Sequence, residues 1–315
     1  MKKKSYKKGI RLITVLAAFM LMAGCVQEIP GAASSSKPVS SSTGREREEE
    51  RSRSQENSTA GKTDSDAKET SKSDEAAKPA DPEIVFYHSE MQINDQVAAE
   101  LKRGSVEIVK SKFTYYEDAY GKKHYHFLIE YKNNGSEMVF TPGVTLRLYD
   151  GNGQKLVDSG FSEVVYGVMR PGETDYAFYD GHLDDKYENG AFVPLNIDLK
   201  KGVVPAIEWI NVQSWNPSDF TFYECETDIV MDITEEGLMR FTGTITNPTD
   251  TDLSMVRVSY LLFDANDEVI GIASMAATLL HAKETKEMLP TALWNQEIKP
   301  EQVAYFKTNA TTWKI

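Results

Sequence analysis

Basic residues and cysteines are scarce in this sequence of 315 residues. Lysine and arginine together number 35, against 48 aspartate and glutamate residues, and the formal charge is −13. Because nucleic acid is held by clustered lysine and arginine, this balance disfavours a nucleic-acid partner. The only cysteines are Cys25 and Cys225. The sequence contains no Gly-rich phosphate loop, no Gly-x-Ser-x-Gly and no His-Glu-x-x-His, so no catalytic residue, resident metal or cofactor is predicted.

The N-terminus combines a basic stretch with a short apolar run. The apolar run extends from Leu12 to Met22 and is interrupted only by Thr14, and six basic residues precede it: Lys2, Lys3, Lys4, Lys7, Lys8 and Arg11. This pattern predicts a secretory signal segment over residues 1–24. An uncleaved signal anchor would begin in the same way, but the run is short for a membrane span, which needs about 20 apolar residues.

The end of that run resembles the lipobox of bacterial lipoproteins. The residues are Leu21-Met22-Ala23-Gly24-Cys25, with Met22 where the family usually has leucine. The resemblance implies that the chain is cut before Cys25 and that the Cys25 thiol carries a diacylglyceryl lipid, with palmitate-like acyl chains. Two or more acyl chains anchor a protein stably, whereas one does not. The expected location is therefore the extracellular face of the cell membrane. Once the signal segment is removed, the formal charge falls to −19.

Residues 25–83 have the composition of a disordered linker. They are rich in Ser, Glu, Lys, Ala and Pro, and between Pro30 and Pro82 they contain no aromatic residue and a single branched aliphatic residue, Val39. Such a segment cannot bury enough apolar surface to offset its conformational entropy. We interpret it as a spacer between membrane and folded part, or alternatively as a low-complexity region that itself binds cell-wall polymer.

The rest of the chain is predicted to be all-β after one short helix. Residues 94–103 begin with the N-cap candidate Asn94 and end before Gly104, which is typical of a helix. Five runs rich in β-branched and aromatic residues follow, separated by turn clusters such as Asn133-Asn134-Gly135: residues 106–109, 113–116, 125–131, 144–149 and 206–212.

The folded part contains an internal repeat. Residues 127–150 align without a gap on residues 241–264 at an offset of 114, so that Asn133 falls on Asn247 and Asp150 on Asp264. Further on, Gly172 corresponds to Lys283 at an offset of 111. Each copy reads as a strand ending at asparagine, a second strand ending in Leu-aromatic-Asp, and a tight turn. The repeat predicts two tandem β-sandwiches, at residues 84–216 and 217–315.

These motifs resemble the FxLyD family of immunoglobulin-like domains. The carrying residues are Leu148-Tyr149-Asp150 and Leu262-Phe263-Asp264, each after a strand, an Asn turn and a second strand. The resemblance covers most of residues 106–215 and 220–315. Such domains often occur on bacterial surface lipoproteins. The resemblance implies an adhesion-like or binding scaffold with no catalytic residues to carry over.

The clearest candidate binding segment is the long insertion of the first copy, residues 178–192. It gathers carboxylates and an aromatic residue, and we predict the binding residues Asp180, His182, Asp184, Asp185 and Tyr187. Its carboxylates could hold calcium, but the spacing is not that of an EF-hand, and a solvated loop is the simpler interpretation.

Two other groups carry side chains that could form a site. His124 and His126 would share one face of a strand, as zinc ligands do, but a third ligand is not evident nearby. Cys225 stands between Glu224 and Glu226, which would raise its pKa, so a buried structural thiol is expected. Paired acids for glycoside cleavage are not singled out by any pattern.

The expected function is therefore a non-enzymatic, lipid-anchored binding or scaffold module at the cell surface. Its expected partners are the membrane, through the lipid, and a cell-wall polymer or a surface protein. Two alternatives stay open at this point. They are a metal-dependent hydrolase of cell-wall polymer and an accessory subunit of a membrane transporter or sensor.

Overall fold

A computed structural model describes residues 83–314 apart from 189, 217, 219 and 236. The described residues all belong to one compact unit, which lies within residues 75–315. The predicted signal segment, Cys25 and almost all of the predicted linker lie outside the described residues. Within the described part, no helix is both long enough and apolar enough to cross a membrane.

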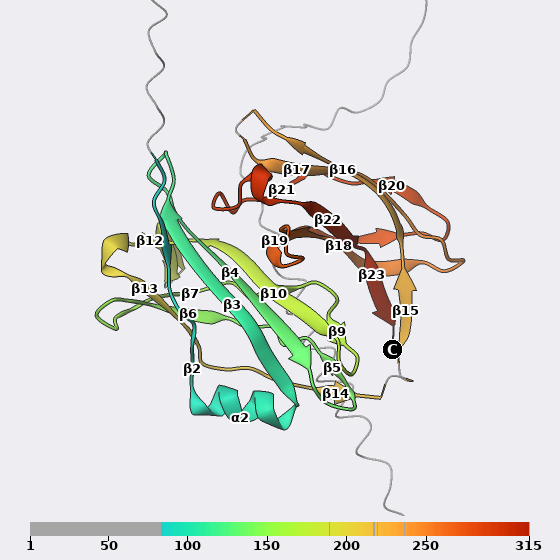
Figure 1. Cartoon of the computed structure of the whole chain (residues 1–315), viewed down its shortest axis with the longest axis horizontal. Coiled ribbons are helices and arrows are strands. Elements are labelled where there is room, and N and C mark those ends of the chain that lie inside the picture. The colour runs from blue at the N-terminus through green and yellow to red at the C-terminus, as the bar shows by residue number, and fades with distance from the viewer. Residues whose placement is uncertain (1–82, 189, 217, 219, 236, 315) are drawn as a thin grey trace, which may run out of the picture. The chain divides into compact units, whose positions relative to one another are not determined.

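The described chain is mostly β, as predicted, with a single α-helix before the long strands (Figure 1). Helix α2 runs over Asp95–Arg103, and the side chain of Asn94 caps it by accepting from the Val97 N–H at 2.9 Å. Gly104 follows, as predicted, but its φ of −85° is one that any residue adopts. A Cβ at Gly104 would lie 2.1 Å from Val212 Cγ1, so close packing rather than backbone conformation requires glycine there.

The first half of the described chain forms three sheets of three or more strands and a separate two-stranded hairpin (Figure 1). A five-stranded sheet has the order β1-β3-β4-β10-β8, from Phe86–His88, Val106–Glu117, Lys123–Asn133, Thr174–His182 and Glu163–Val164. A second sheet has the order β2-β13-β6-β7, from Gln92–Ile93, Val203–Ile207, Leu146–Asp150 and Lys155–Asp158. A three-stranded sheet has the order β14-β5-β9, from Ser214–Trp215, Met138–Phe140 and Val168–Met169.

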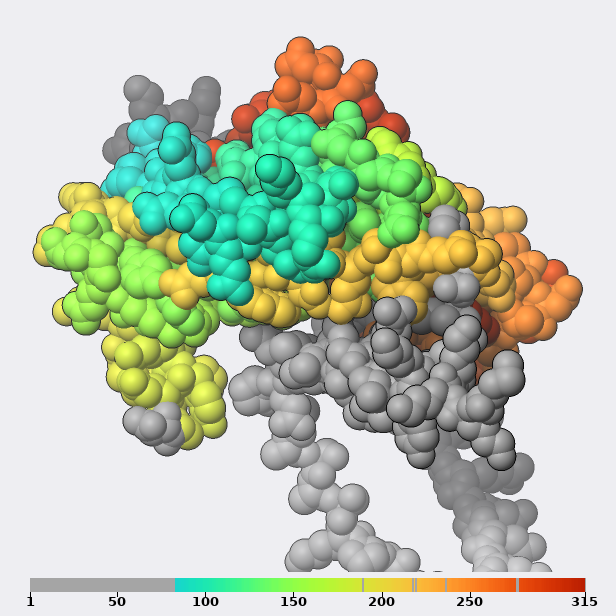
Figure 2. Space-filling model, turned by 90° about the horizontal axis from the view of Figure 1, so that it is seen from below, coloured from blue at the N-terminus to red at the C-terminus, as the bar shows by residue number. Residues whose placement is uncertain are grey.

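The insertion of the first half forms a hairpin. Strands β11 (Asp185–Glu188) and β12 (Ala191–Pro194) pair only with each other among the described strands. Figure 2 shows this part of the chain, in yellow, as a lobe that stands out from the surface around it. A 3-10 turn, Leu199–Lys201, follows before β13.

The second half repeats the arrangement with fewer strands. One sheet has the order β16-β17-β20, from Glu226–Ile233, Met239–Thr246 and Thr285–Glu287, and the short β21 (Thr291–Ala292) also pairs with β17. The other has the order β19-β18-β22, from Val269–Leu280, Leu253–Phe263 and Tyr305–Asn309. A separate pair joins β15 (Thr221–Glu224) to β23 (Thr311–Lys314), and a 3-10 turn spans Pro300–Gln302.

Strand limits differ from the sequence prediction by two residues or fewer at the ends of β4 and β6, and by more in two places. Residues 106–109 and 113–116 were expected as separate strands but form one, β3, whose register shifts between Ile108 and Lys110. The run predicted over 206–212 is also displaced, because β13 ends at Ile207. Both errors arise where pairing with a neighbouring strand, rather than local composition, sets the limits.

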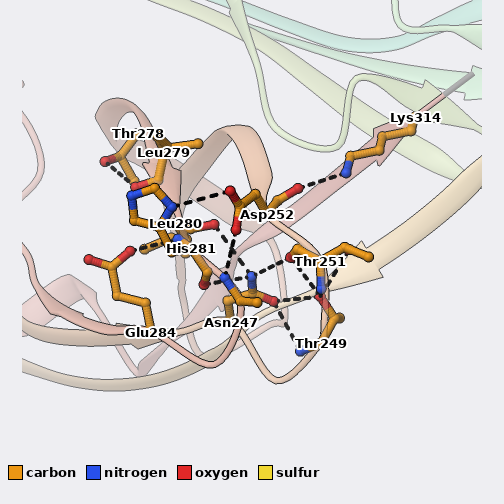
Figure 3. Close-up of polar contacts among 11 residues, drawn as sticks. Asn247, Thr249, Thr251, Asp252, Thr278, Leu279, Leu280, His281, Glu284 and Lys314 are labelled. Carbon is orange, nitrogen blue, oxygen red and sulfur yellow. Dashed lines mark hydrogen bonds and ion pairs between the residues drawn. The ribbon is translucent and has the colours of Figure 1, made fainter.

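Equivalent residues of the two halves make equivalent bonds. The Asn133 amide donates to the carbonyls of Glu137 and Met169, and the Asn247 amide donates to those of Thr251 and Leu280. Figure 3 shows the Asn247 side chain pointing into this turn. The tight turns agree as well, since the carboxylates of Asp150 and Asp264 each accept from the backbone two and four residues later. The internal repeat is confirmed at the level of hydrogen bonds.

Each half has its own buried core, and two smaller clusters join them. The core of the first half centres on fully buried residues such as Ile129, Tyr131 and Leu148, and that of the second on Phe241 and Tyr260, whose rings stack at 4.3 Å. The joining clusters contain buried residues of both halves: Val165, Phe178, Leu261, Val269 and Ile272 in one, and Met138, Val168 and Phe220 in the other.

Candidate functional site

Four of the five predicted binding residues lie in two separate places, and the fifth, Asp184, lies between them. Asp180 and His182 belong to the end of β10, where they stand opposite His126 and His124 of β4. Asp185 and Tyr187 belong to the hairpin strand β11. The expectation that residues 178–192 form one continuous loop is therefore wrong, because its first five residues continue a strand of the main sheet.

Asp184 has a structural role between the two places. Its carboxylate accepts from the Lys123 N–H at 3.0 Å, and its backbone carbonyl accepts from the Leu195 N–H at 2.7 Å. These bonds close the base of the hairpin and attach it to the beginning of β4. The carboxylate is thus turned towards the backbone of the fold.

Four of the five histidines gather on one face of the five-stranded sheet. Strand pairing places His88, Thr114, His126 and Asp180 in one row across β1, β3, β4 and β10. The adjacent row on the same face carries Phe86, Tyr116, His124 and His182. The sequence indicated only that His124 and His126 share a face, and the cluster itself depends on the pairing of four strands.

Carboxylates and a phenol hold this histidine cluster in place. His126 is buried, and its Nδ1 contacts Asp180 Oδ1 while its Nε2 lies 3.3 Å from the Tyr116 hydroxyl. The Tyr116 ring stacks on the rings of both His124 and His126. The Nε2 of His124 lies 3.0 Å from Asp118 Oδ2. Contacts within the cluster thus hold both ring nitrogens of His126 and the Nε2 of His124.

Burial and neighbouring charge shift the pKa of three members. Burial, together with the nearby His124, lowers the pKa of His182. Burial opposes ionisation of Asp118, but the Lys122 N–H and His124 outweigh it and lower the pKa of that carboxyl. Burial raises the pKa of Tyr116 above its usual range, so this hydroxyl stays protonated. At neutral pH the cluster therefore combines a carboxylate with protonated phenol and mostly neutral imidazole at His182.

The arrangement does not assemble a metal centre. Within the described residues, no three histidine, cysteine or acidic side chains are placed to hold one ion. The carboxylates of Asp180 and Asp184 that suggested a calcium loop face different partners, His126 and the Lys123 backbone. Neither the calcium nor the zinc interpretation gains support.

A residue of the second half completes this face. The Glu297 carboxylate contacts His88 Nε2 at 2.7 Å, Lys112 Nζ at 2.9 Å and the Thr114 hydroxyl at 2.8 Å. Burial opposes its ionisation, but the bonds from Lys112 and His88 outweigh burial and lower the pKa of Glu297. Sequence reasoning missed both His88 and Glu297. No local pattern marks them, because they meet only through the contact between the halves.

The space beside this contact is small. A cavity of about 20 Å³ is lined by residues of both halves, among them Thr114, His126, Asp180, Leu293 and Asn295. Such a volume holds about one water molecule. The part of the histidine face beside His126 and Asp180 is thus closely packed against the second half, whereas His88 and His182 are exposed.

The hairpin, in contrast, presents side chains to solvent. Tyr187 and Phe192 stand directly opposite each other, with ring centroids 5.3 Å apart, and are 68% and 71% exposed. An ion pair between Lys186 and Glu188 at 3.0 Å lies on the same strand. Gly190 has a φ of +85°, which the turn between the strands requires. The result is a two-stranded support for an exposed aromatic pair.

Comparisons with known proteins add little. No protein-family model matches the sequence, and no curated protein is significantly similar to it. Among solved structures, the N-terminal CBM22-1-CBM22-2 tandem domain of Paenibacillus barcinonensis Xyn10C aligns with 73% of this chain and 93% of its own. The identity is 10% and the TM-score is 0.11.

Proposed function

We propose that this protein is a membrane-anchored extracellular lipoprotein that acts as a non-catalytic binding or scaffold module at the bacterial cell surface. The signal segment and the Leu-Met-Ala-Gly-Cys stretch ending at Cys25 support the anchor. The mostly β described part supports a rigid scaffold, and the FxLyD resemblance fits this role. The single observation that carries the binding role is the exposed pair Tyr187 and Phe192 on the hairpin.

An exposed aromatic pair costs solvation free energy, which binding to a partner recovers. Large aromatic side chains are enriched at the centres of interfaces and contribute much of their free energy of binding. Here strand pairing already restricts both rings, so little further conformational entropy is lost on binding. We propose that this pair contacts a cell-wall polymer or a surface protein.

The hairpin is tested by removing its rings. In the full chain we expect the double substitution Tyr187→Ser and Phe192→Ser to reduce retention on isolated cell wall that has been stripped of lipid, which the Cys25 anchor cannot bind, at least tenfold. The matched control is Tyr120→Ser, which removes a ring that is 89% exposed at the turn between β3 and β4. Unchanged retention of the double variant, or equal loss in the control, would contradict binding through the hairpin.

The anchor is tested independently of the hairpin. Mass spectrometry of the mature protein is expected to find a lipid on the Cys25 sulfur, and the Cys25→Ser variant is expected to be released into the medium or to stay uncut. An unmodified Cys25 thiol in a freely secreted chain would refute the anchor and leave the binding result unaffected.

A further inference from the structure

Strand β16 is an edge strand whose equivalent in the first half has a partner. In the first half, β3 pairs with β4 on one side and with β1 on the other. In the second half, β16 pairs with β17, as β3 does with β4, and no strand of the described chain pairs with its other side. The first half thus shows that this edge of the repeat accepts an added extended segment, which the described second half lacks.

The backbone of β16 is oriented to accept such a segment. The carbonyls of Gly243 and Met239 on β17 accept from Met288 and Leu293, on the side away from β16. In an antiparallel pair of strands, two kinds of opposite residues alternate. In one kind the N–H and C=O groups of the two residues bond to each other, and in the other kind these groups point away from the partner strand. Ile229 and Ile233 stand opposite Gly243 and Met239, so their N–H and C=O groups point to the open edge. Thr227 and Met231 lie two residues from Ile229, so their N–H and C=O groups also point to the open edge.

Two common protections against strand addition, a β-bulge and a proline, are missing along β16. Its eight residues pair with β17 without a break in register, and they include no proline. No residue of β16 is fully buried, and Val230 and Ile233 are 61% and 46% exposed. By contrast, β19, which is also at a sheet edge, has register shifts and packs Val269 and Ile272 against the first half. Bulges and covering elements of that kind protect an edge.

The charge of β16 selects the kind of partner. Glu226, Asp228 and Val230 alternate along the strand, so they share the exposed face. Asp232 is neutralised by two bonds from Arg240, whereas Glu226 and Asp228 form no ion pair within the described part of the chain. Pairing of two copies through β16 would bring these acids together, which disfavours a homodimer. An incoming strand with basic side chains on this face would neutralise them.

We propose that β16 is a strand-addition site for an extended basic segment of a partner protein, with basic residues at alternate positions opposite Glu226 and Asp228. Main-chain hydrogen bonds to the open edge provide affinity, and the two carboxylates provide selectivity. In the incoming strand, the residues between the basic ones lie on the same face of the sheet as Ile229 and Met231. Because Ile229 and Met231 pack against the core of the second half, we expect these residues of the partner to be apolar. This site is separate from the hairpin and does not depend on the lipid anchor.

The test uses two synthetic peptides and the full chain. One peptide is an acetylated and amidated octamer of alternating lysine and valine, and the other has glutamate in place of lysine. We expect the lysine peptide to bind and to slow hydrogen exchange of the Thr227, Ile229 and Met231 amides. The double substitution Glu226→Lys and Asp228→Lys is expected to weaken binding of the lysine peptide at least tenfold and to favour the glutamate peptide.

The matched control changes the charge equally at a distance from β16. It is the double substitution Glu90→Lys and Glu301→Lys, because both residues are exposed acids outside β16. We expect it to change the affinity less than threefold. An equal loss in the control, peptide binding without protection of the three amides, no binding by the lysine peptide, or dimerisation through β16 in place of peptide binding would each overturn the proposal.

Discussion

Asn133 and Asn247 are both fully buried and make matching hydrogen bonds at equivalent points of the two halves. The side-chain oxygen of each accepts from the backbone N–H two residues later, at Gly135 and Thr249. Each amide thereby ties the end of one strand to a distant segment, at Met169 or at Leu280 and His281. Buried backbone groups need such partners, so one side chain satisfies several at once.

The first prediction is that Asn133→Ala and Asn247→Ala each destabilise the protein by at least about 2 kcal/mol, because buried carbonyls lose their donor. Urea unfolding measures the change in the free energy of unfolding. The control is Asn134→Ala, whose exposed amide bonds only Glu107 and which should cost less than about 0.5 kcal/mol. Equal effects at positions 133 and 134 would refute the role of burial.

A second prediction concerns Asp175, which is fully buried and accepts from Thr141, Tyr166, Gly167 and Tyr176. Burial outweighs these donors and raises the pKa of Asp175 to about 6. The folded state therefore binds the proton more tightly than the unfolded state. This contribution to stability is fully present below about pH 4 and is lost as the pH rises to about 6.

This loss corresponds to a free energy of unfolding on the order of 3 kcal/mol. It is measured as the difference between the wild type and Asp175→Asn at pH 4, 5, 6 and 7, with carbon NMR to titrate the carboxyl directly. We expect the wild type to lose stability relative to the variant over this range. A carboxyl that titrates at its ordinary pKa would contradict the prediction.

The third prediction is that Cys225 reacts slowly with iodoacetamide. Burial, with a smaller effect of Glu224, raises the pKa of this thiol to about 11. Glu226 was also expected to contribute, but burial is the main cause. Because the thiolate is the nucleophile, alkylation at pH 8 should be on the order of 100-fold slower than in urea. Peptide mapping by mass spectrometry assigns the labelled cysteine, and rapid labelling of the folded chain would refute burial.

Features set by neighbouring residues could be predicted from the sequence. The helix with its Asn94 cap and the two Asp turns depend on contacts within a few residues. Because the sequence repeats, the turns of the second copy could be predicted from those of the first. Limits that depend on pairing were less accurate, as β3 and β13 show. The hairpin has a local signal as well, since Asn189-Gly190 between Tyr187 and Phe192 is typical of a hairpin turn.

The histidine face could not be predicted in the same way. His124 and His126 are neighbours on one strand, but His88 and His182 reach them only through the register of four strands. Glu297 adds a contact between residues more than 180 positions apart. No spacing rule extends that far, so the sequence indicated two isolated histidines where the structure has a cluster.

The last prediction concerns Glu297 at the contact between the halves. Glu297→Gln keeps the shape of the side chain but removes the charge that Lys112 and His88 contact, so we expect a loss of about 1 to 3 kcal/mol at pH 7. The folded pKa of Glu297 is lowered, so its contribution is present above the ordinary pKa of glutamate, about 4.5, and is lost as the pH falls through the folded value.

The stability difference between the wild type and Glu297→Gln should therefore be largest near neutral pH and vanish towards pH 3. Glu301→Gln, at an exposed acid four residues away, is the matched control and should show no such dependence. Urea unfolding of the three proteins at pH 3, 4, 5 and 7 measures this. A difference that persists at pH 3 would mean that shape, and not charge, holds the segment around Glu297 on the histidine face.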